Sequence, residues 1–135
     1  MAGIIVDSGE RLLLDTALLN LPGNVVKLAK AAFTVRNNQV VTDFTEADFD
    51  GYAPEPLIYA GLMPANPGGR AIATFNSVVF AAINNAVPNL IYGYWFESAA
   101  GVLIGVERYA GLPKNMIAAG DTITIDQTLR LWSPS

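Results

Sequence analysis

Four acidic residues crowd one short stretch of the chain, TDFTEADFDG, and they are the side chains best suited to chemistry. Asp43, Glu46, Asp48 and Asp50 could supply the two carboxylates of a glycoside hydrolase or oxygen ligands for Ca²⁺. Their crowding in sequence does not place two carboxylates across a cleft, and their spacing does not match the EF-hand loop. The stretch is therefore predicted to be a solvated loop rather than a catalytic or metal site.

Histidine and cysteine are both absent from the chain. Without an imidazole or a thiol, the usual nucleophile and base pairs cannot form, and no disulfide framework exists. The PGGR segment at residues 67–70 lacks the Lys-Ser/Thr of a phosphate-binding loop. We therefore expect no enzymatic activity, no cofactor and no bound metal.

Aromatic side chains offer a second kind of site. Tyr52, Tyr59 and Trp132 could form a platform on which sugar rings stack. Packing inside a core or an interface is the commoner role of such residues, because they bury large areas wherever they pack. A glycan-binding surface therefore remains an alternative rather than the favoured interpretation.

Composition limits the class of protein. The chain has 135 residues, of which 52% are hydrophobic and 15% are charged, with a formal net charge of −4. This charge disfavours a nucleic-acid partner, since such proteins gather Lys and Arg, and no apolar run reaches the roughly 20 residues that cross a bilayer. The charged fraction falls below the roughly 25% of an average globular protein. We expect one soluble domain without a signal peptide that self-associates to cover apolar surface.

The elements that must position these side chains are mostly strands. Leucines at helical spacing predict one helix over residues 8–21, ended by Pro22-Gly23. Short apolar runs separated by Gly, Pro and Asn predict strands over residues 24–35, 57–62 and 70–83. The first could also form a helix, and the third is one strand or a bent pair with Phe75, Val79 and Ile83 on one side. Residues 88–132 are expected to form three consecutive strands, and the last of these, over 121–132, alternates between two sides: Ile123, Ile125, Leu129 and Leu131 on one, and Thr122, Thr124, Asp126, Thr128 and Arg130 on the other. The pattern predicts a mainly β domain, an antiparallel β-sandwich or jelly-roll-like fold with one N-terminal α-helix.

The hairpin over residues 90–109 is apolar on both predicted faces. A loop at residues 98–101 sets Trp95 opposite Ile104 and Tyr92 opposite Glu107. The second face is then covered either by a helix or loop of this chain, as in the central hairpin of a sandwich, or by a neighbouring subunit. We favour the subunit, so that only one face belongs to the core of this chain. An apolar arm at residues 1–6 could also reach a neighbour. The predicted interface residues are Tyr92, Tyr94, Phe96, Trp95, Ile104, Val106, Tyr109, Ile4 and Ile5.

Several short motifs resemble a family of small virion proteins of tailed bacteriophages. The family pattern has an ERLLLDTALL-type helix, an F-T-E-A-x-F-x-G-Y-A loop, a V-Y-G-Y strand, an L-x-x-x-E-R-F/Y strand and a closing G-D-x-L/I-x-I strand. Residues 57–89 match only loosely. The matching positions after the helix are Phe44, Thr45, Glu46, Ala47, Phe49, Gly51, Tyr52, Ala53, Ile91, Tyr92, Gly93, Tyr94, Leu103, Glu107, Arg108, Tyr109, Gly120, Asp121, Ile123 and Ile125.

The resemblance implies a non-enzymatic structural protein of the virion, assembled in the host cytoplasm. A capsid decoration or cement protein is the leading expectation: a homo-oligomer, with a trimer as the natural symmetry at local threefold positions, bound to the major capsid protein or another virion protein. The alternative is a receptor-binding or glycan-binding module at a tail or fibre tip.

Overall fold

The computed structural model describes residues 23–36, 38–62, 72–84, 87–126 and 128–130. The predicted helix over residues 8–21 and the predicted arm over residues 1–6, with Ile4 and Ile5, lie outside these residues. The described part is mainly β, and every strand pairing in it is antiparallel, as the sequence predicts. In chain order the elements are β1 (Val25–Ala29), the 3₁₀ helix η1 (Val41–Asp43), β2 (Glu55–Pro56), β3 (Tyr59–Leu62), β4 (Ile72–Phe75), β5 (Val78–Ala81), β6 (Asn89–Ile91), β7 (Gly93–Glu97), β8 (Leu103–Arg108), β9 (Lys114–Met116), β10 (Thr122–Ile125) and β11 (Thr128–Arg130).

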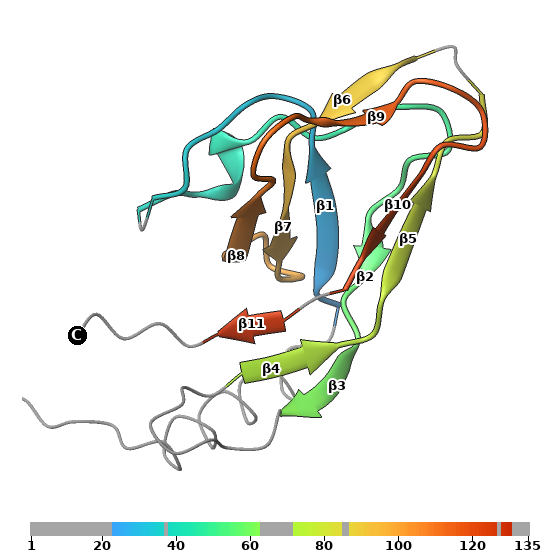
Figure 1. Ribbon diagram of the computed structural model, residues 1–135. Coiled ribbons are helices and arrows are strands. Elements are labelled where there is room, and N and C mark those ends of the chain that lie inside the picture. The colour runs from blue at the N-terminus through green and yellow to red at the C-terminus, as the bar shows by residue number, and fades with distance from the viewer. Residues whose placement is uncertain (1–22, 37, 63–71, 85–86, 127, 131–135) are drawn as a thin grey trace, which may run out of the picture.

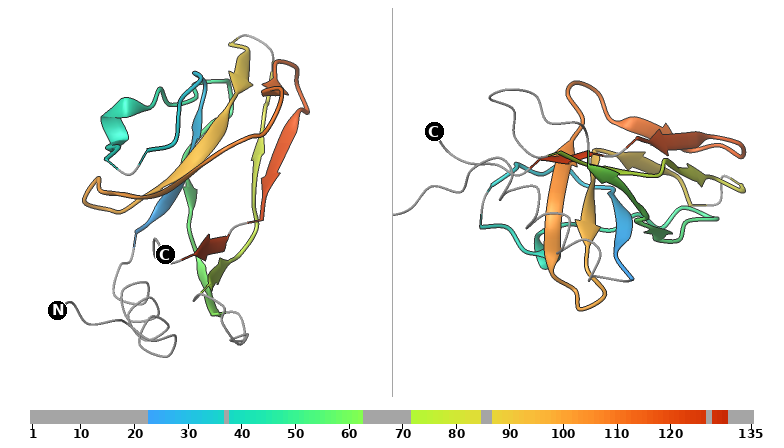
Figure 2. Two further views of the ribbon diagram at one scale, coloured as in Figure 1. Left: turned by 60° about the vertical axis from the view of Figure 1, so that its left-hand side comes forward. Right: turned by 90° about the horizontal axis from the view of Figure 1, so that it is seen from below.

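The described strands form four hydrogen-bonded groups (Figure 1). The largest is a four-stranded sheet in the order β2-β1-β7-β8. The others are the ladder β10-β5, the three-stranded sheet β11-β4-β3 and the ladder β6-β9. Figures 1 and 2 show β5 and β10 on one side of β1, and β8 with the loop that follows β1 on the other side.

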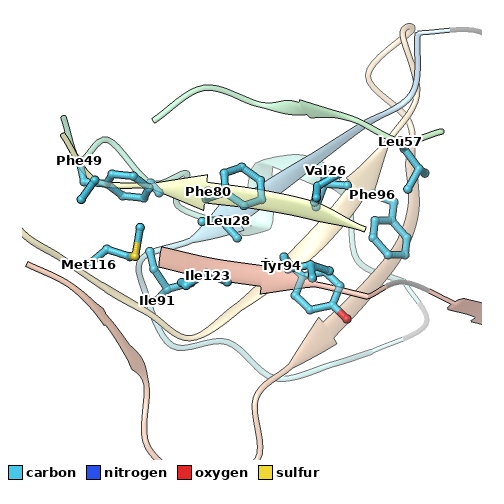
Figure 3. Packing of buried hydrophobic residues seen from close by; sticks show 14 of the residues in the cluster. Val26, Leu28, Phe49, Leu57, Phe80, Ile91, Tyr94, Phe96, Met116 and Ile123 are labelled. Atoms are coloured by element: carbon cyan, nitrogen blue, oxygen red, sulfur yellow. The ribbon is translucent and has the colours of Figure 1, made fainter. Parts of the chain in front are cut away.

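One large core lies between the four-stranded sheet and the β5-β10 ladder (Figures 2 and 3). Alternation explains how each strand contributes to it: Val26 and Leu28 of β1 are buried, as are Ile123 and Ile125 of β10. We call this set the main core. Its buried members are Val26, Leu28, Ala47, Phe49, Leu57, Phe75, Val78, Phe80, Ala82, Ile91, Tyr94, Phe96, Met116, Ile123 and Ile125.

A smaller apolar cluster lies on the other face of the β1-β7-β8 sheet. We call it the second cluster, and its buried residues are Ala29, Phe33 and Trp95. Val41, Phe44, Tyr92, Leu103 and Val106 are partly buried against it. The central strands are therefore covered by this chain on both faces.

The predicted register of the β7-β8 hairpin is wrong by two residues. Trp95 pairs with Val106, not Ile104, and Tyr94 pairs with Glu107. The register shifts at a bulge between Phe96 and Glu97, and Gly101 adopts φ +81° in the turn. A bulge adds a residue to one strand, and loop length alone does not reveal it. Ile104 consequently packs against the main core, while Leu103 packs against the second cluster.

Three long predicted strands are each divided between different sheets. Residues 70–83 form β4 and β5, the bent pair considered in the prediction, but Phe75 is buried while Val79 and Ile83 are exposed, so these three do not share one side. The run 121–132 contains β10, paired with β5, and β11, paired with β4. Residues 88–97 likewise form β6 and β7, and β9 was not predicted.

Candidate interface

The predicted interface residues that the structure describes are covered by the chain itself. Tyr94 and Phe96 belong to the main core, and Trp95, only 2% exposed, belongs to the second cluster. The expectation that only one hairpin face belongs to the core of this chain is therefore wrong. The other members are partly buried: Ile104 and Tyr109 against the main core, Tyr92 and Val106 against the second cluster.

The loop after β1, residues 30–44, covers Trp95. The Phe44 ring stacks on Trp95 with centroids 5.0 Å apart and planes 18° apart, and Phe33 meets the Phe44 ring edge-on at 5.1 Å. Gln39 closes this loop, because its Oε1 accepts from the Arg36 N–H at 2.8 Å and its Nε2 donates to the Thr34 carbonyl at 2.7 Å. The hydrogen bonds of Gln39 therefore help to hold Phe33 and Phe44 over Trp95.

A half-buried polar network joins residues 43–50, which we call the acidic segment, to strands β1 and β7 of the four-stranded sheet. Lys27 Nζ lies 3.2 Å from Glu97 Oε2 and 3.7 Å from Glu46 Oε2. Trp95 Nε1 donates to Glu97 Oε2 at 3.0 Å, and the Tyr52 hydroxyl donates to Glu46 Oε1 at 3.0 Å. Burial, together with the neighbouring Glu46 charge, raises the pKa of Tyr52 well above its ordinary value. These groups stabilise the loop on β1, and Tyr52 is a donor within that network.

Asp48 and Asn89 fix the next turn of the same segment. Lys30 Nζ lies 2.7 Å from Asp48 Oδ2, and this contact holds the pKa of the Asp48 carboxyl below its ordinary value. The buried Asn89 accepts from the N–H groups of Asp48 and Phe49 through Oδ1 and donates to Asp48 Oδ1 through Nδ2. A buried amide that satisfies two backbone donors explains how an irregular loop packs on β6.

The remaining acidic side chains of the segment have separate partners. Asp43 Oδ2 accepts from the Val40 N–H at 2.9 Å, and Asp50 accepts from the Asn84 side chain. Within the described ranges, no group of three or more His, Cys, Asp and Glu side chains gathers as a metal site would require. The same residues contain no helix of the length and hydropathy that a membrane span requires.

A tyrosine pair lies beside the carboxylate of Glu107 at the edge of the main core. The Tyr94 hydroxyl donates to Glu107 Oε2 at 2.5 Å. The Tyr109 hydroxyl is buried and has no hydrogen-bond partner among the described residues, and burial with the nearby Glu107 charge raises the pKa of Tyr109 to about 12. Lys114 Nζ lies 4.4 Å from the centroid of the Tyr109 ring.

The residues considered for sugar stacking do not form one exposed platform. Tyr52 stacks on Phe80, with centroids 5.8 Å apart, and Tyr59 lies 5.9 Å from Phe75. Both tyrosines pack against the main core. Trp132 lies outside the described residues.

An exposed and uncharged surface is found instead on the outer side of the β5-β10 ladder. Val79 pairs with Thr124 and Ala81 with Thr122, and all four side chains point away from the main core. Val79 is 53% exposed, and Ile83 just beyond the strand is 69% exposed. We call Val79, Ala81, Thr122 and Thr124 the β5-β10 face. Sequence alternation identified the threonine side of β10, but the pairing that places Val79 beside it is non-local.

No protein-family model matches the chain, and neither the curated proteins nor the solved structures contain a match.

Proposed function

We propose that this chain is a non-enzymatic structural protein of a bacteriophage virion. Its most specific form is a capsid decoration or cement protein that self-associates, binds the major capsid protein or another virion protein, and stabilises the shell after assembly in the host cytoplasm. The sequence motifs shared with small phage virion proteins support this assignment.

The observation that carries the proposal is the exposed, uncharged β5-β10 face. Strand faces that meet only water usually carry charged or strongly polar residues, whereas this face carries valine, alanine and two threonines. Uncharged, partly apolar surface of this kind is typical of a contact with another protein. The low charged fraction of the whole chain, 15%, points the same way.

The fold proposed for this role is a β-sandwich or jelly roll with an N-terminal helix over residues 8–21. The main core shared by the four-stranded sheet and the β5-β10 ladder supports the two-layer arrangement. Such a domain would stabilise a shell by mass action. Each copy buries a modest area, and contacts to several shell subunits combine through their high effective concentration.

A tail or fibre-tip module that binds glycans is the second candidate. The arrangement of Tyr52 and Tyr59 favours the decoration protein, because both rings pack against the main core and leave their faces unavailable for stacking on a sugar.

Rebinding to virions stripped of this protein tests the proposal. The unmodified chain is expected to rebind, and Val79→Lys, which places a charge in the middle of the β5-β10 face, is expected to bind at least about tenfold more weakly. Val102→Lys is the matched control, because Val102 is 61% exposed in the β7-β8 turn, outside that face. No rebinding of the unmodified chain, or equal binding by all three proteins, would contradict the proposal.

A further inference from the structure

Three side chains of complementary chemistry meet where the chain leaves β1: an amine, a carboxylate and a carboxamide. Lys30 directly follows β1, Asp48 lies in the acidic segment, and Asn89 is the first residue of β6. The Lys30 N–H donates to the Thr45 carbonyl at 2.9 Å, which places the acidic segment beside Lys30. Figure 1 shows β6 close to the same end of β1. Residues far apart in the sequence therefore share one small site.

The carboxylate of Asp48 bridges the amine and the amide. Its Oδ2 lies 2.7 Å from Lys30 Nζ, and its Oδ1 accepts from Asn89 Nδ2 at 2.9 Å. Both distances fall in the range over which a general acid or base exchanges a proton with its partner. Asp48 can therefore take a proton from the lysine amine and deliver one to the nitrogen of the amide.

The side-chain carbonyl of Asn89 lies in a pair of hydrogen-bond donors that resembles an oxyanion hole. The backbone N–H groups of Asp48 and Phe49 donate to Asn89 Oδ1 at 2.8 and 3.1 Å. Asn89 Nδ2 also donates to the Pro88 carbonyl at 2.8 Å, so the plane of the amide is fixed. Two donors on one carbonyl oxygen polarise the C=O bond and stabilise the negative charge that develops there when a nucleophile attacks the carbon.

The exposure of the three groups suits a condensation. Asn89 is 6% exposed and the Lys30 side chain is 31% exposed, so the amine and the amide are largely shielded from water. The Asp48 side chain is 55% exposed. The site is therefore open to solvent at the carboxylate, on the side from which a small leaving group such as ammonia can escape.

We propose that Lys30 and Asn89 condense into an intramolecular amide bond, with Asp48 as the general base and then the general acid. Asp48 takes a proton from the Lys30 ammonium group, and the lone pair of Nζ attacks Cγ of Asn89. The Nζ–Cγ bond forms while the C=O electrons move to Oδ1, where the two backbone N–H groups bind the charge.

The bond to the leaving nitrogen breaks in the second half of the reaction. Asp48 returns its proton to Nδ2 of Asn89, the C=O bond re-forms, and the Cγ–Nδ2 bond breaks to release ammonia. The remaining extra proton on Nζ passes to the ammonia, so a lysine ammonium and a carboxamide become a secondary amide and an ammonium ion. The step requires no oxidant and no co-reactant.

The new bond would join the end of β1 to the start of β6. A covalent link between residues distant in sequence restricts the unfolded chain, as a disulfide does, and this chain contains no cysteine. The bond would form in the isolated folded chain. It is therefore independent of the proposed role in a virion, and either can fail without the other.

Mass spectrometry of the intact, folded chain tests the proposal. Release of ammonia should lower the mass by about 17 Da relative to the sequence. A tryptic digest should contain residues 28–36 joined to residues 71–108, because trypsin does not cleave after an acylated lysine. A chain that keeps its full mass after prolonged incubation in the folded state, or that loses ammonia without yielding the joined peptides, would overturn the proposal.

Three variants test the role of each group. Lys30→Arg keeps a cation beside Asp48 but removes the amine, and Asp48→Ala removes the bridging carboxylate; both are expected at their full sequence mass. Lys27→Arg is the matched control, because Lys27 also pairs with carboxylates, Glu46 and Glu97, and this variant should still lose ammonia.

Circular dichroism checks that each variant is folded. Loss of ammonia from Lys30→Arg would overturn the proposed bond. Loss of ammonia from Asp48→Ala as complete and as fast as from the unmodified chain would contradict the role given to Asp48.

Discussion

Gly93 offers a direct test of the β7-β8 register through a single methyl group. A Cβ at this position would lie 2.2 Å from the Glu107 carbonyl oxygen, 2.7 Å from Phe33 Cζ and 3.0 Å from Arg108 Cα. Two of these atoms are backbone, so rotation of one side chain cannot relieve the clash. β7 and β8 would have to move apart at this position. We therefore expect Gly93→Ala to lower the free energy of unfolding by about 3 kcal/mol.

Gly111→Ala is the comparison that isolates this steric cost. Gly111 has φ +93°, and a Cβ there would meet no atom within 4 Å, so the variant should lose only about 1–2 kcal/mol from the left-handed backbone conformation. Urea unfolding followed by tryptophan fluorescence measures both variants. A Gly93→Ala loss equal to or smaller than that of Gly111→Ala would refute the register and the close packing of Phe33 on it.

Three further perturbations test the rest of the packing. Phe44→Ala removes the ring stacked on Trp95 and should cost about 2–4 kcal/mol in urea unfolding, with a red shift of tryptophan emission; an unshifted spectrum would show that the loop does not cover this face. Asn89→Ala leaves two backbone N–H groups without their acceptor and should cost about 2–4 kcal/mol, whereas a loss below about 0.5 kcal/mol would mean that water replaces the amide. The phenol of Tyr109 has its pKa raised from 10.0 to about 12, so its contribution to stability is present below pH 10 and is lost as the pH rises through about 12. Ultraviolet difference absorbance should show this late ionisation. Tyr109→Phe should abolish it without loss of stability at neutral pH, because the hydroxyl has no partner within the described ranges; a destabilised variant would reveal a hydrogen bond.

The alternation of apolar and polar residues along a strand correctly predicted which side chains of that strand face the core. The inward Ile123 and Ile125 and the outward Thr122 and Thr124 of β10 are confirmed, as is the mainly β, antiparallel character of the chain. A strand with one buried face carries this information in its own residues, since successive side chains alternate between faces.

Two other features could not be predicted from alternation: which strands pair with each other, and which residues cover the outer face of the sheet. The β7-β8 register depends on a bulge at Phe96/Glu97, and the division of residues 121–130 into two strands depends on different partners, β5 and β4. Coverage of Trp95 depends on Phe33 and Phe44, which are more than 50 residues away in sequence. An apolar strand face looks the same in sequence whether a loop of the same chain or another subunit covers it.

The acidic segment illustrates a related limit. Its carboxylates suggest chemistry when only their types are known, but Glu46 and Asp48 bind Lys27 and Lys30, and Asp43 caps a turn. Lys27 lies in β1 and Lys30 directly follows it, so the carboxylates meet their lysine partners only after β1 has packed beside residues 43–50. The structural role of these carboxylates cannot be seen from their spacing in sequence.

A cryo-electron microscopy map of the intact virion tests the central claim most directly. We predict density for this chain on the outside of the capsid shell, in clusters of three, with the β5-β10 face at a contact between protein subunits. Density confined to the tail or its fibres, or a β5-β10 face open to solvent in every copy, would contradict the account.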